Sequence, residues 1–464
     1  MASLQSAASK LQKVGQLLDS LEQDLQEKKL TSSQKTQYLL QLREHGATPP
    51  YAGPIYSSKG INILAQYGVE GETSDVCRAA LRCVANALFL KEDMRQVFVD
   101  TGYGGRLAER LRLENSDDEM PASRILFLST YNTTMDFDKL IKNHSLGENI
   151  IYQLTRHANQ FPKSGGEPLT QMDQMALTET LKLIFNISKL YDLGAAFSPA
   201  IPSILKIISR IEIPTRPLDG LIGQLINSLF VLDIEEKNGK LSGSNPLFPA
   251  FDPKCNIDKL IKVLDQSVSV YSPDELNKMA VPLLHSLIVI YGVAPEELRK
   301  HMQSLLLPAD SDRSEPIGRS DTLASRLLKL STGPNEYLKT GISELMFVLA
   351  DRDAENLTRR IGYGFAAGFL ASRGMEVPKS ASEAYADGAT ELDAVNPITG
   401  QRWTAEPKDS GPPMTKAEKE REAERLFVLF ERAKANGLLN VENPVTQALH
   451  EGRFEELSDD TDSD

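Results

Sequence analysis

Cysteine is scarce in this chain, and its scarcity excludes two kinds of site. Only Cys77, Cys83 and Cys255 occur among 464 residues, too few for a disulfide framework or for a four-cysteine zinc site. The six histidines are dispersed and do not fall at ligand spacing with these cysteines. We therefore predict no metal site and no cofactor, with the cysteines as small semi-apolar fillers in a reducing compartment.

Long apolar runs and an excess of positive charge are missing as well. No segment approaches the roughly 18 apolar residues that a membrane span requires, so we predict no integral membrane segment. Lysine and arginine number 51 against 64 for aspartate and glutamate, which gives a formal net charge of −13. A general nucleic-acid binder of that sign would need a basic patch within an acidic protein, and we predict no nucleic-acid partner.

Motifs that carry enzyme chemistry are also missing. The sequence has no G-x-S-x-G nucleophile elbow, no H-E-x-x-H zinc helix and no G-x-x-x-x-G-K-[ST] phosphate loop. Two glycine-rich stretches, 102–105 and 362–370, follow no predicted strand, and we interpret both as tight turns between helices. Without a convergent nucleophile and base, an enzyme is a poorly supported hypothesis.

The first 375 residues carry helical periodicity almost throughout. Between residues 9 and 27, leucine and valine recur every three or four positions, which leaves one apolar stripe and a charged opposite face. The same spacing recurs in later segments as far as residue 349, whereas the two-residue alternation of β-strands appears nowhere. We therefore predict an all-α fold.

One kind of apolar helix recurs within this region. Four segments can be aligned without gaps on one polar side chain near the middle of each: 81–90, 181–190, 223–232 and 281–290. The polar residues are Asn86, Asn186, Asn227 and His285. The 41 residues from Asn186 to Asn227 match the period of armadillo and HEAT units. We predict an armadillo/HEAT-repeat superhelix over residues 1–375.

Two interpretations of these polar residues are open. In an armadillo superhelix the innermost helices line a groove, and asparagines repeated there bind the backbone of a peptide, because an amide offers donor and acceptor together. Alternatively, each asparagine satisfies a buried backbone group between repeats. Under the first interpretation the four positions are candidates for partner binding.

Arginines accompany the same helices. Five lie on or beside the helices that we expect to be innermost: Arg43, Arg78, Arg82, Arg124 and Arg326. If several face the groove, they form a cationic pocket for a carboxylate or for an acidic peptide face. Ordinary solvated helix arginines are the alternative.

The sequence changes character after residue 375. Residues 376–414 hold five prolines among serine, alanine and glycine, which predicts a surface linker. A helix follows, and the remaining tail, 438–464, is acidic towards its end, so we expect it to be solvated.

The helix after the linker is predicted over 415–437. It opens with a capping box at Thr415 and is followed by a glycine suited to a helix end. Leu426, Phe427 and Phe430 fall on one apolar stripe. Such a stripe predicts docking, either on the array or on a partner.

Six segments together resemble the synembryn, or resistance-to-inhibitors-of-cholinesterase, family in a fungal-type version: 81–104, 123–141, 181–188, 320–375, 396–400 and 418–437. The resemblance runs from about residue 38 to 440 and is most specific over 320–375. It implies an armadillo/HEAT superhelix that acts on the α subunit (Gα) of heterotrimeric G proteins. The implied roles are guanine nucleotide exchange factor and folding chaperone, without bond chemistry.

The same resemblance implies roles for particular regions. The groove takes the C-terminal helix of Gα, while the last helix and the tail reach the Gα nucleotide-binding domain. By position, segment 40–45 nominates Arg43 and segment 81–86 nominates Asn86. We expect a cytoplasmic protein that Gα recruits to the plasma membrane.

Phosphorylation is predicted at two places. Animal members carry an acidic Ser/Thr cluster in the linker that casein kinase phosphorylates, whereas this chain has only two serines over 379–385. Ser116 and Thr461 fit an acidic-directed kinase better, because acids follow each of them. An unmodified acidic run is the alternative at both.

An armadillo-type adaptor or import receptor, binding a linear peptide in the Asn ladder, is the alternative function. Such a receptor for basic peptides needs acids and tryptophan on the groove helices. The single tryptophan, Trp403, falls in the linker, so the sequence favours the exchange factor.

Overall fold

The structure is a computed structural model that describes residues 2–161, 169–234, 245–375, 396, 399–406 and 415–435, apart from the side chains of residues 2–7, 310, 420 and 429–435. Within these ranges the chain is helical and contains no β-strand, which confirms the predicted all-α fold. The α-helices are α1 (Ala2–Glu27), α2 (Ser32–Gly46), α3 (Ser58–Glu70), α4 (Ser74–Leu90), α5 (Asp93–Asp100), α6 (Gly104–Arg110), α7 (Ser116–Leu128), α8 (Phe137–His144), α9 (Leu146–Gln160), α10 (Gln171–Tyr191), α11 (Ile201–Arg210), α12 (Leu221–Val231), α13 (Cys255–Val270), α14 (Pro273–Met279), α15 (Val281–Val293), α16 (Glu296–Leu306), α17 (Leu323–Ser331), α18 (Glu336–Leu349), α19 (Ala354–Ile361), α20 (Tyr363–Ser372) and α21 (Lys416–Ala435). Four 3-10 helices are η1 (Gly53–Tyr56), η2 (Gly194–Ala200), η3 (Asp310–Ser314) and η5 (Trp403–Ala405).

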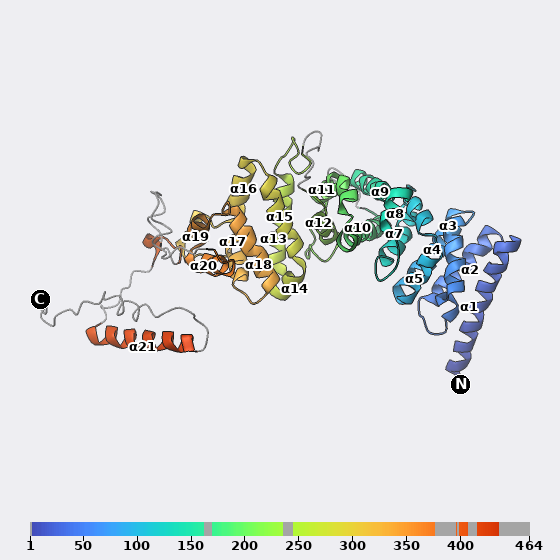
Figure 1. The fold of residues 1–464 in the computed structure, drawn as a ribbon, viewed down its shortest axis with the longest axis horizontal. Coiled ribbons are helices and arrows are strands. Elements are labelled where there is room, and N and C mark those ends of the chain that lie inside the picture. The colour runs from blue at the N-terminus through green and yellow to red at the C-terminus, as the bar shows by residue number, and fades with distance from the viewer. Residues whose placement is uncertain are drawn as a thin grey trace, which may run out of the picture. The chain divides into compact units, whose positions relative to one another are not determined.

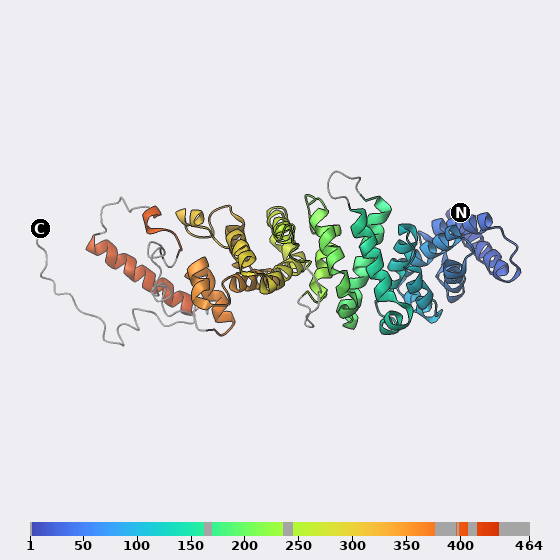
Figure 2. The same ribbon diagram turned by 90° about the horizontal axis from the view of Figure 1, so that it is seen from above.

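The chain divides into two compact units, Met1–Ala405 and Glu406–Asp464. The first unit holds α1 to α20, and Figures 1 and 2 show these helices following one another in sequence order. The second unit contains α21. Each unit is described by itself below.

One series of helices connects the repeats of the first unit. Helix α4 packs on α7, α7 on α10, α10 on α12, α12 on α15, and α15 on α18. The four segments that align in the sequence lie on α4, α10, α12 and α15, and α7 fills the long interval between the first two. This serial packing is that of a helical-repeat superhelix and confirms the predicted fold class.

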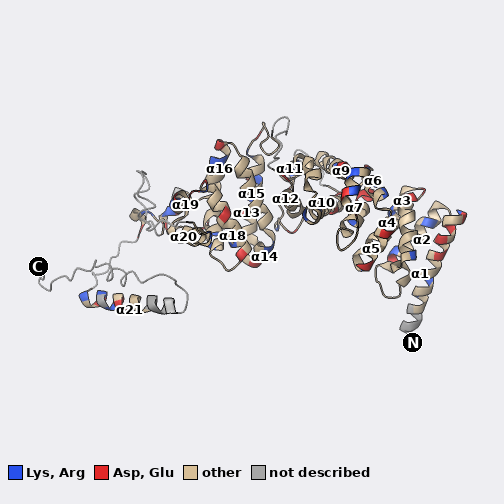
Figure 3. Ribbon diagram, viewed as in Figure 1, with Lys and Arg blue, Asp and Glu red and all other residues tan. Residues whose placement is uncertain are grey.

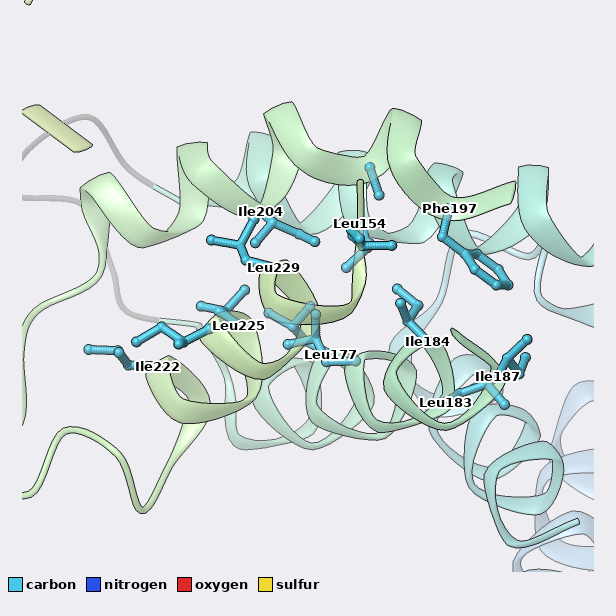
Figure 4. Packing of buried hydrophobic residues seen from close by; sticks show 14 of the residues in the cluster. Leu154, Leu177, Leu183, Ile184, Ile187, Phe197, Ile204, Ile222, Leu225 and Leu229 are labelled. Atoms are coloured by element: carbon cyan, nitrogen blue, oxygen red, sulfur yellow. The ribbon is translucent and has the colours of Figure 1, made fainter. Parts of the chain in front are cut away.

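The core lies between this series and the helices packed behind it. Figure 4 shows Leu154 of α9 and Ile204 of α11 facing Ile184 of α10 and Leu229 of α12, all of them fully buried. The apolar positions recur every three or four residues because only one face of each helix meets its neighbours. Burying each such side chain contributes roughly 1.5–3 kcal/mol to stability.

Helix starts follow the capping signals in the sequence. The Thr31 hydroxyl accepts the Gln34 N–H while the Gln34 side chain accepts the Thr31 N–H, and Ser272 with Glu275 does the same at α14. These bonds satisfy backbone donors that the first helical turn leaves unpaired. At the predicted capping box, Glu418 accepts the Thr415 N–H at 2.9 Å, which is one of the two bonds of such a box.

The two glycine-rich stretches differ from each other. Gly102 lies in the turn between α5 and α6 with φ +77°, as predicted. Of the second stretch, only Gly362, with φ +83°, forms a turn, and the residues after it form α20. The prediction of a turn over all of 362–370 was therefore wrong, because burial of Phe369 and Leu370 outweighs the low helix propensity of glycine.

Residues 399–405 form a strap on the first unit. The Ile317 N–H donates to the Thr399 carbonyl at 2.9 Å, and the Arg402 N–H donates to the Arg313 carbonyl at 2.9 Å. The compact unit therefore extends to Ala405, beyond residue 375, where the sequence placed the end of the array. Most of the predicted linker, 376–414, and the tail, 438–464, lie outside the described residues.

Helices α14 and α15 meet at a bend of 58°. Ala280 separates them, and Pro282 falls in the first turn of α15. Among the described residues no single helix has both the length and the hydropathy of a membrane span, although this bent pair reaches them together.

Candidate functional site

Aromatic rings and positive charges contact one another from helix to helix along the series. The Arg124 guanidinium of α7 lies 5.1 Å from the ring centroid of Phe89 on α4. Lys182 of α10 lies 5.8 Å from the Phe127 centroid on α7. The carboxylate of Glu179 lies between these two contacts, 3.8 Å from Arg124 and 3.1 Å from Lys182. The first three members of the series are thus joined by one network.

The row continues on α12 and α15. Lys189, two turns after Lys182 on α10, lies 6.0 Å from the Phe230 centroid. The ring of His285 meets that of Phe230 edge to face, with the centroids 5.0 Å apart. We call this surface the ladder face and define it by these residues: Phe89, Arg124, Phe127, Lys182, Lys189, Phe230 and His285.

The ladder face combines exposed apolar area with charge. Phe89 is 57% exposed, His285 is exposed, and Phe127 and Phe230 are half-buried. Aromatic rings with neighbouring cations are typical of binding surfaces, since they offer large apolar area at a low cost in side-chain entropy. We therefore take the ladder face as the candidate partner-binding site.

Two of the predicted asparagines accompany this face. Asn86 precedes Phe89 by three residues on α4, and Asn227 precedes Phe230 by three on α12, so each shares a helix face with its phenylalanine. Both are half-buried, and neither side chain makes a hydrogen bond to another residue that the structure describes. Their amides are available to a peptide backbone.

Asn186 is used differently. Its side chain is 5% exposed, and its amide nitrogen donates to the Thr130 hydroxyl at 2.7 Å, which ties α10 to the end of α7. The amide is bonded between repeats, as the alternative interpretation expects, but to a side-chain hydroxyl rather than to a backbone group. The prediction that Asn186 lines the binding surface is not supported by its burial.

Four of the five predicted arginines are held in ion pairs. Arg78 binds Asp118 at 2.6 Å and Arg82 binds Asp117 at 2.6 Å, both from α4 to α7. Arg326 binds Asp265 at 2.6 Å, and Arg124 contacts Glu179 on the ladder face. The predicted cationic pocket is therefore corrected: carboxylates of neighbouring helices neutralise these charges.

Arg43 is the exception among the five. It is exposed on α2, and its guanidinium makes no ion pair with a described carboxylate. It lies near Cys83 of α4, where burial raises the pKa of the thiol to about 12 against the opposing charge of Arg43. Arg43 is thus the one cation of the predicted set that is open to a partner's carboxylate.

The acids that bind Arg78 and Arg82 lie at the start of α7. Asp118 also forms an ion pair with Arg110, at 2.7 Å. Glu119 is fully buried and accepts from Arg156 at 2.6 Å and from Thr180 at 2.6 Å. We call residues 116–119, with the arginines that they bind, the α7 clamp, and Figure 3 shows both signs of charge around this helix. A helix N-terminus suits acids because its backbone dipole is positive there.

Ser116 belongs to the clamp and is not an accessible phosphorylation site in this fold. It is 8% exposed, its hydroxyl donates to Asp173, and it accepts from Arg156 at 3.0 Å. Burial alone would raise the pKa of Asp173, but hydrogen bonds from Ser116 and Thr170 lower it below its ordinary value. The acids after Ser116 are structural, which favours the unmodified alternative.

The remaining predicted site residues fall in the second unit. Leu426 is 58% exposed and Phe427 is 40% exposed on α21, so part of the predicted apolar stripe is uncovered. The side chain of Phe430 and all of Thr461 lie outside the described residues. Over the part of the chain that the structure describes, no group of three potential metal ligands occurs.

The sequence contained a signal for the ladder face that we missed. When the four helices are aligned on their polar residue, the position three residues later holds Phe89, Lys189, Phe230 and Ile288. Residues three apart share a helix face. An aromatic or cation repeated there, next to a repeated amide, marks the surface that the structure then assembles.

Comparisons with known proteins identify the family of this chain. A family described as guanine nucleotide exchange factor synembryn matches residues 38–453. A synembryn-like chaperone of Schizosaccharomyces pombe is 27% identical over 304 residues, 61% of this chain and 56% of that protein. Chaperone Ric-8A of Macaca fascicularis is 24% identical over 462 residues, 89% of this chain and 84% of that protein.

A further relative covers nearly the whole chain, whereas the solved structures add little. Chaperone Ric-8A of Xenopus laevis is 24% identical over 516 aligned residues, 97% of this chain and 92% of that protein. A crystal structure of an engineered protein aligns over 58% of this chain and 95% of its own, with 17% identity and a TM-score of 0.38. The match over residues 38–453 spans most of the sequence, and the chain therefore belongs to the guanine nucleotide exchange factor synembryn family.

Proposed function

We propose that this chain is a guanine nucleotide exchange factor and folding chaperone for Gα, and that it binds the C-terminal helix of Gα on the ladder face. The observation that carries the proposal is membership of the synembryn family over residues 38–453. The names of the Ric-8A relatives support the chaperone role. The same proposal places the chain in the cytoplasm, with Gα bringing it to the plasma membrane.

The chemistry of the ladder face suits an amphipathic peptide helix. The rings of Phe89 and Phe230 offer apolar contact, while Asn86 and Asn227 offer a donor and an acceptor beside them. Arg43 adds a cation that suits a carboxylate at the end of the bound helix. A helix that presents apolar side chains and ends in a carboxylate meets all three features.

Exchange follows from binding alone and needs no catalytic residue. The C-terminal helix of Gα connects through a strand to the loop that contacts guanine. Binding that helix is favourable only if the loop is displaced, so formation of the complex lowers the affinity of Gα for GDP. By linkage, bound GDP lowers the affinity of Gα for this chain by the same factor. We expect a stable complex without nucleotide and release by GTP, and chaperoning follows from the same preference for an open α subunit.

Helix α21 is proposed as a second contact with Gα. Exposure of Leu426 and Phe427 to water is unfavourable, since burial of each side chain contributes a free energy of about 1.5–3 kcal/mol. A tethered helix binds a partner at a raised effective concentration. We propose that α21 contacts Gα away from the ladder face and helps to trap its open form.

The test is nucleotide exchange on purified Gα with a fluorescent GTP analogue. Saturating full-length chain should accelerate exchange, and size-exclusion chromatography should show a complex that GDP or GTP dissociates. If exchange stays at its intrinsic rate and no complex forms without nucleotide, the proposed function is wrong.

A truncation separates the two contacts. A chain ending at Ala405 keeps the whole first unit and its strap. It should still bind a peptide with the sequence of the Gα C-terminus, yet exchange nucleotide slowly. If the truncated chain exchanges nucleotide as fast as the full chain, α21 does not contribute to exchange and this part of the proposal is wrong.

A further inference from the structure

A cavity with positive lining lies near the C-terminal end of the first unit. Its volume is about 670 Å³, and α16, α19 and the segment through η3 contribute its walls. Four of its lining residues are cations, Lys300, Arg313, Arg359 and Arg360, and none of the described lining residues is acidic. Figure 3 shows Lys and Arg on both α16 and α19. In a chain with a net charge of −13 this is a local reversal of sign.

Arg313 forms the fixed wall of the cavity. Its side chain is almost completely buried, and it donates to the Gly400 carbonyl of the strap at 3.0 Å. It also donates to the carbonyls of Arg359 and Arg360 at 3.2 and 3.4 Å, which closes the last turn of α19. These bonds hold the backbone of the two neighbouring arginines in place.

Among the described residues, the side chains of Arg359 and Arg360 have no partners. Neither guanidinium makes a hydrogen bond or an ion pair with a residue that the structure describes. The Nε atom of Arg359 is buried from solvent and has no acceptor. A buried donor without an acceptor is costly, and each such group in a folded protein calls for an explanation. An anion bound to this guanidinium would bring an acceptor close to it.

Two acids that adjoin lining residues of the cavity have other partners. Asp312 is buried, and it accepts the Ala309 N–H and the hydroxyls of Ser320 and Thr322. Glu296 pairs with Lys300 at 2.7 Å on the exposed side of α16. The charge of the arginine pair is therefore not balanced from within the cavity.

We propose that this cavity binds a compact, multiply charged phosphate compound through Arg359 and Arg360, with Lys300 at the rim. Guanidinium groups bind phosphate with two parallel hydrogen bonds, whereas lysine contributes a point charge. The volume lies in the range of small-molecule sites and exceeds the need of one phosphate. An inositol polyphosphate has this chemistry, either as a soluble compound or as a lipid headgroup.

Binding is tested on the full chain with inositol hexakisphosphate as the probe, by titration calorimetry and thermal shift. The variant Arg359→Gln with Arg360→Gln should bind at least tenfold more weakly. It keeps the backbone carbonyls that Arg313 binds, so its melting temperature without probe should stay near that of the wild type. This measurement does not depend on Gα, so its outcome is separate from that of the proposed exchange activity.

A matched control removes the same charge elsewhere. Arg106 and Lys142 are 62% and 68% exposed, and Arg106→Gln with Lys142→Gln also lowers the charge by two. This control should bind the probe as the wild type does. Equal weakening in both double variants would show diffuse attraction rather than a site and would overturn the proposal, as would no binding to the wild type.

Two further arms identify the source of the phosphate. Binding to phosphatidylcholine vesicles only when they contain phosphatidylinositol bisphosphate, with loss in the Arg359/Arg360 variant, supports a headgroup. Binding of the soluble probe without vesicle binding supports a soluble compound. A synthetic peptide of residues 451–464 is the acidic competitor, and if it alone binds the cavity, the phosphate proposal is wrong and the chain's own tail is the ligand.

Discussion

The first unit uses its positive charges in two different ways. In the α7 clamp, Arg78 and Arg82 reach across to carboxylates of the next repeat, and these ion pairs hold helices together. On the ladder face, Arg124 and Lys182 lie beside aromatic rings that remain partly exposed. The comparison shows that an arginine on a repeat helix has no fixed role, because the acids or rings that the next helix presents decide it.

The largest expected effect tests the structural half of this comparison. Glu119→Gln removes a buried negative charge, and Arg156 and His157 then lose the carboxylate that they contact. Breaking a buried ion pair on one side costs about 3–5 kcal/mol, and we expect a loss of that size in the free energy of unfolding, measured by urea denaturation. Glu109→Gln is the control, since Glu109 is half exposed where it meets His144 and should cost at most about 1 kcal/mol. Equal losses would contradict the clamp.

A second buried pair extends the comparison to the start of the array. Asp24 of α1 lies 3.1 Å from Lys35 of α2 and accepts the Tyr67 hydroxyl at 2.7 Å. Burial alone would raise the pKa of Asp24, but the Leu30 N–H, Tyr67 and Lys35 outweigh this and lower it below 3.8. The carboxylate therefore stabilises the fold at neutral pH, and that contribution is lost as pH falls below 3.8.

Asp24→Asn isolates this contribution. We expect it to lower the free energy of unfolding by about 3 kcal/mol at pH 7, because among the described residues Lys35 then keeps Glu72, at 3.3 Å, as its one counter-charge. The difference between wild type and variant should shrink as pH falls below 3.8. A difference independent of pH would show that packing rather than charge is responsible.

The ladder face should show the opposite pattern, with binding lost and stability kept. Phe89→Ala and Phe230→Ala should each weaken Gα binding at least tenfold, about 1.4 kcal/mol. Because Phe89 is 57% exposed, we expect its truncation to change the melting temperature little. Phe251, 86% exposed before α13, provides the control, and Phe251→Ala should bind normally. Loss of binding by the control to the same degree would remove the ladder face as the site.

Effects of comparable or smaller size separate the asparagines. Asn86→Ala and Asn227→Ala should each cost about 1–2 kcal/mol of Gα binding and little stability. Asn186→Ala should instead cost about 1 kcal/mol of unfolding free energy, because Thr130 loses its donor. Binding titrations and denaturant melts of all three variants test this, and identical behaviour would mean that the two interpretations are not distinguished by burial.

Local features of the fold were predictable from the sequence, whereas its pairings were not. Helix periodicity and the bond from the Thr415 N–H to Glu418 depend on nearby residues, so the helices and α21 were predicted. Arg78 and Asp118 are 40 residues apart, and no local pattern joins them. The sequence therefore predicted arginines beside the series but not the carboxylates that neutralise them.

The candidate site was predicted in part for the same reason. The repeated polar position identified the helices that form the ladder face, and there the amides of Asn86 and Asn227 make no hydrogen bond to the other described residues. Asn186 differs because its amide donates to Thr130, which follows α7. The aromatic contacts of Phe89 and Phe230 arise between repeats, and only the folded chain brings each ring to its cation.

The most direct test of the account is the rate of GDP release from Gα in the presence of the Phe89→Ala, Phe230→Ala double variant. The account predicts acceleration by the wild type and by Phe251→Ala, and release near the intrinsic rate with the double variant at the same concentration. A double variant that melts like the wild type and accelerates GDP release as fast would contradict the claim that the ladder face binds Gα.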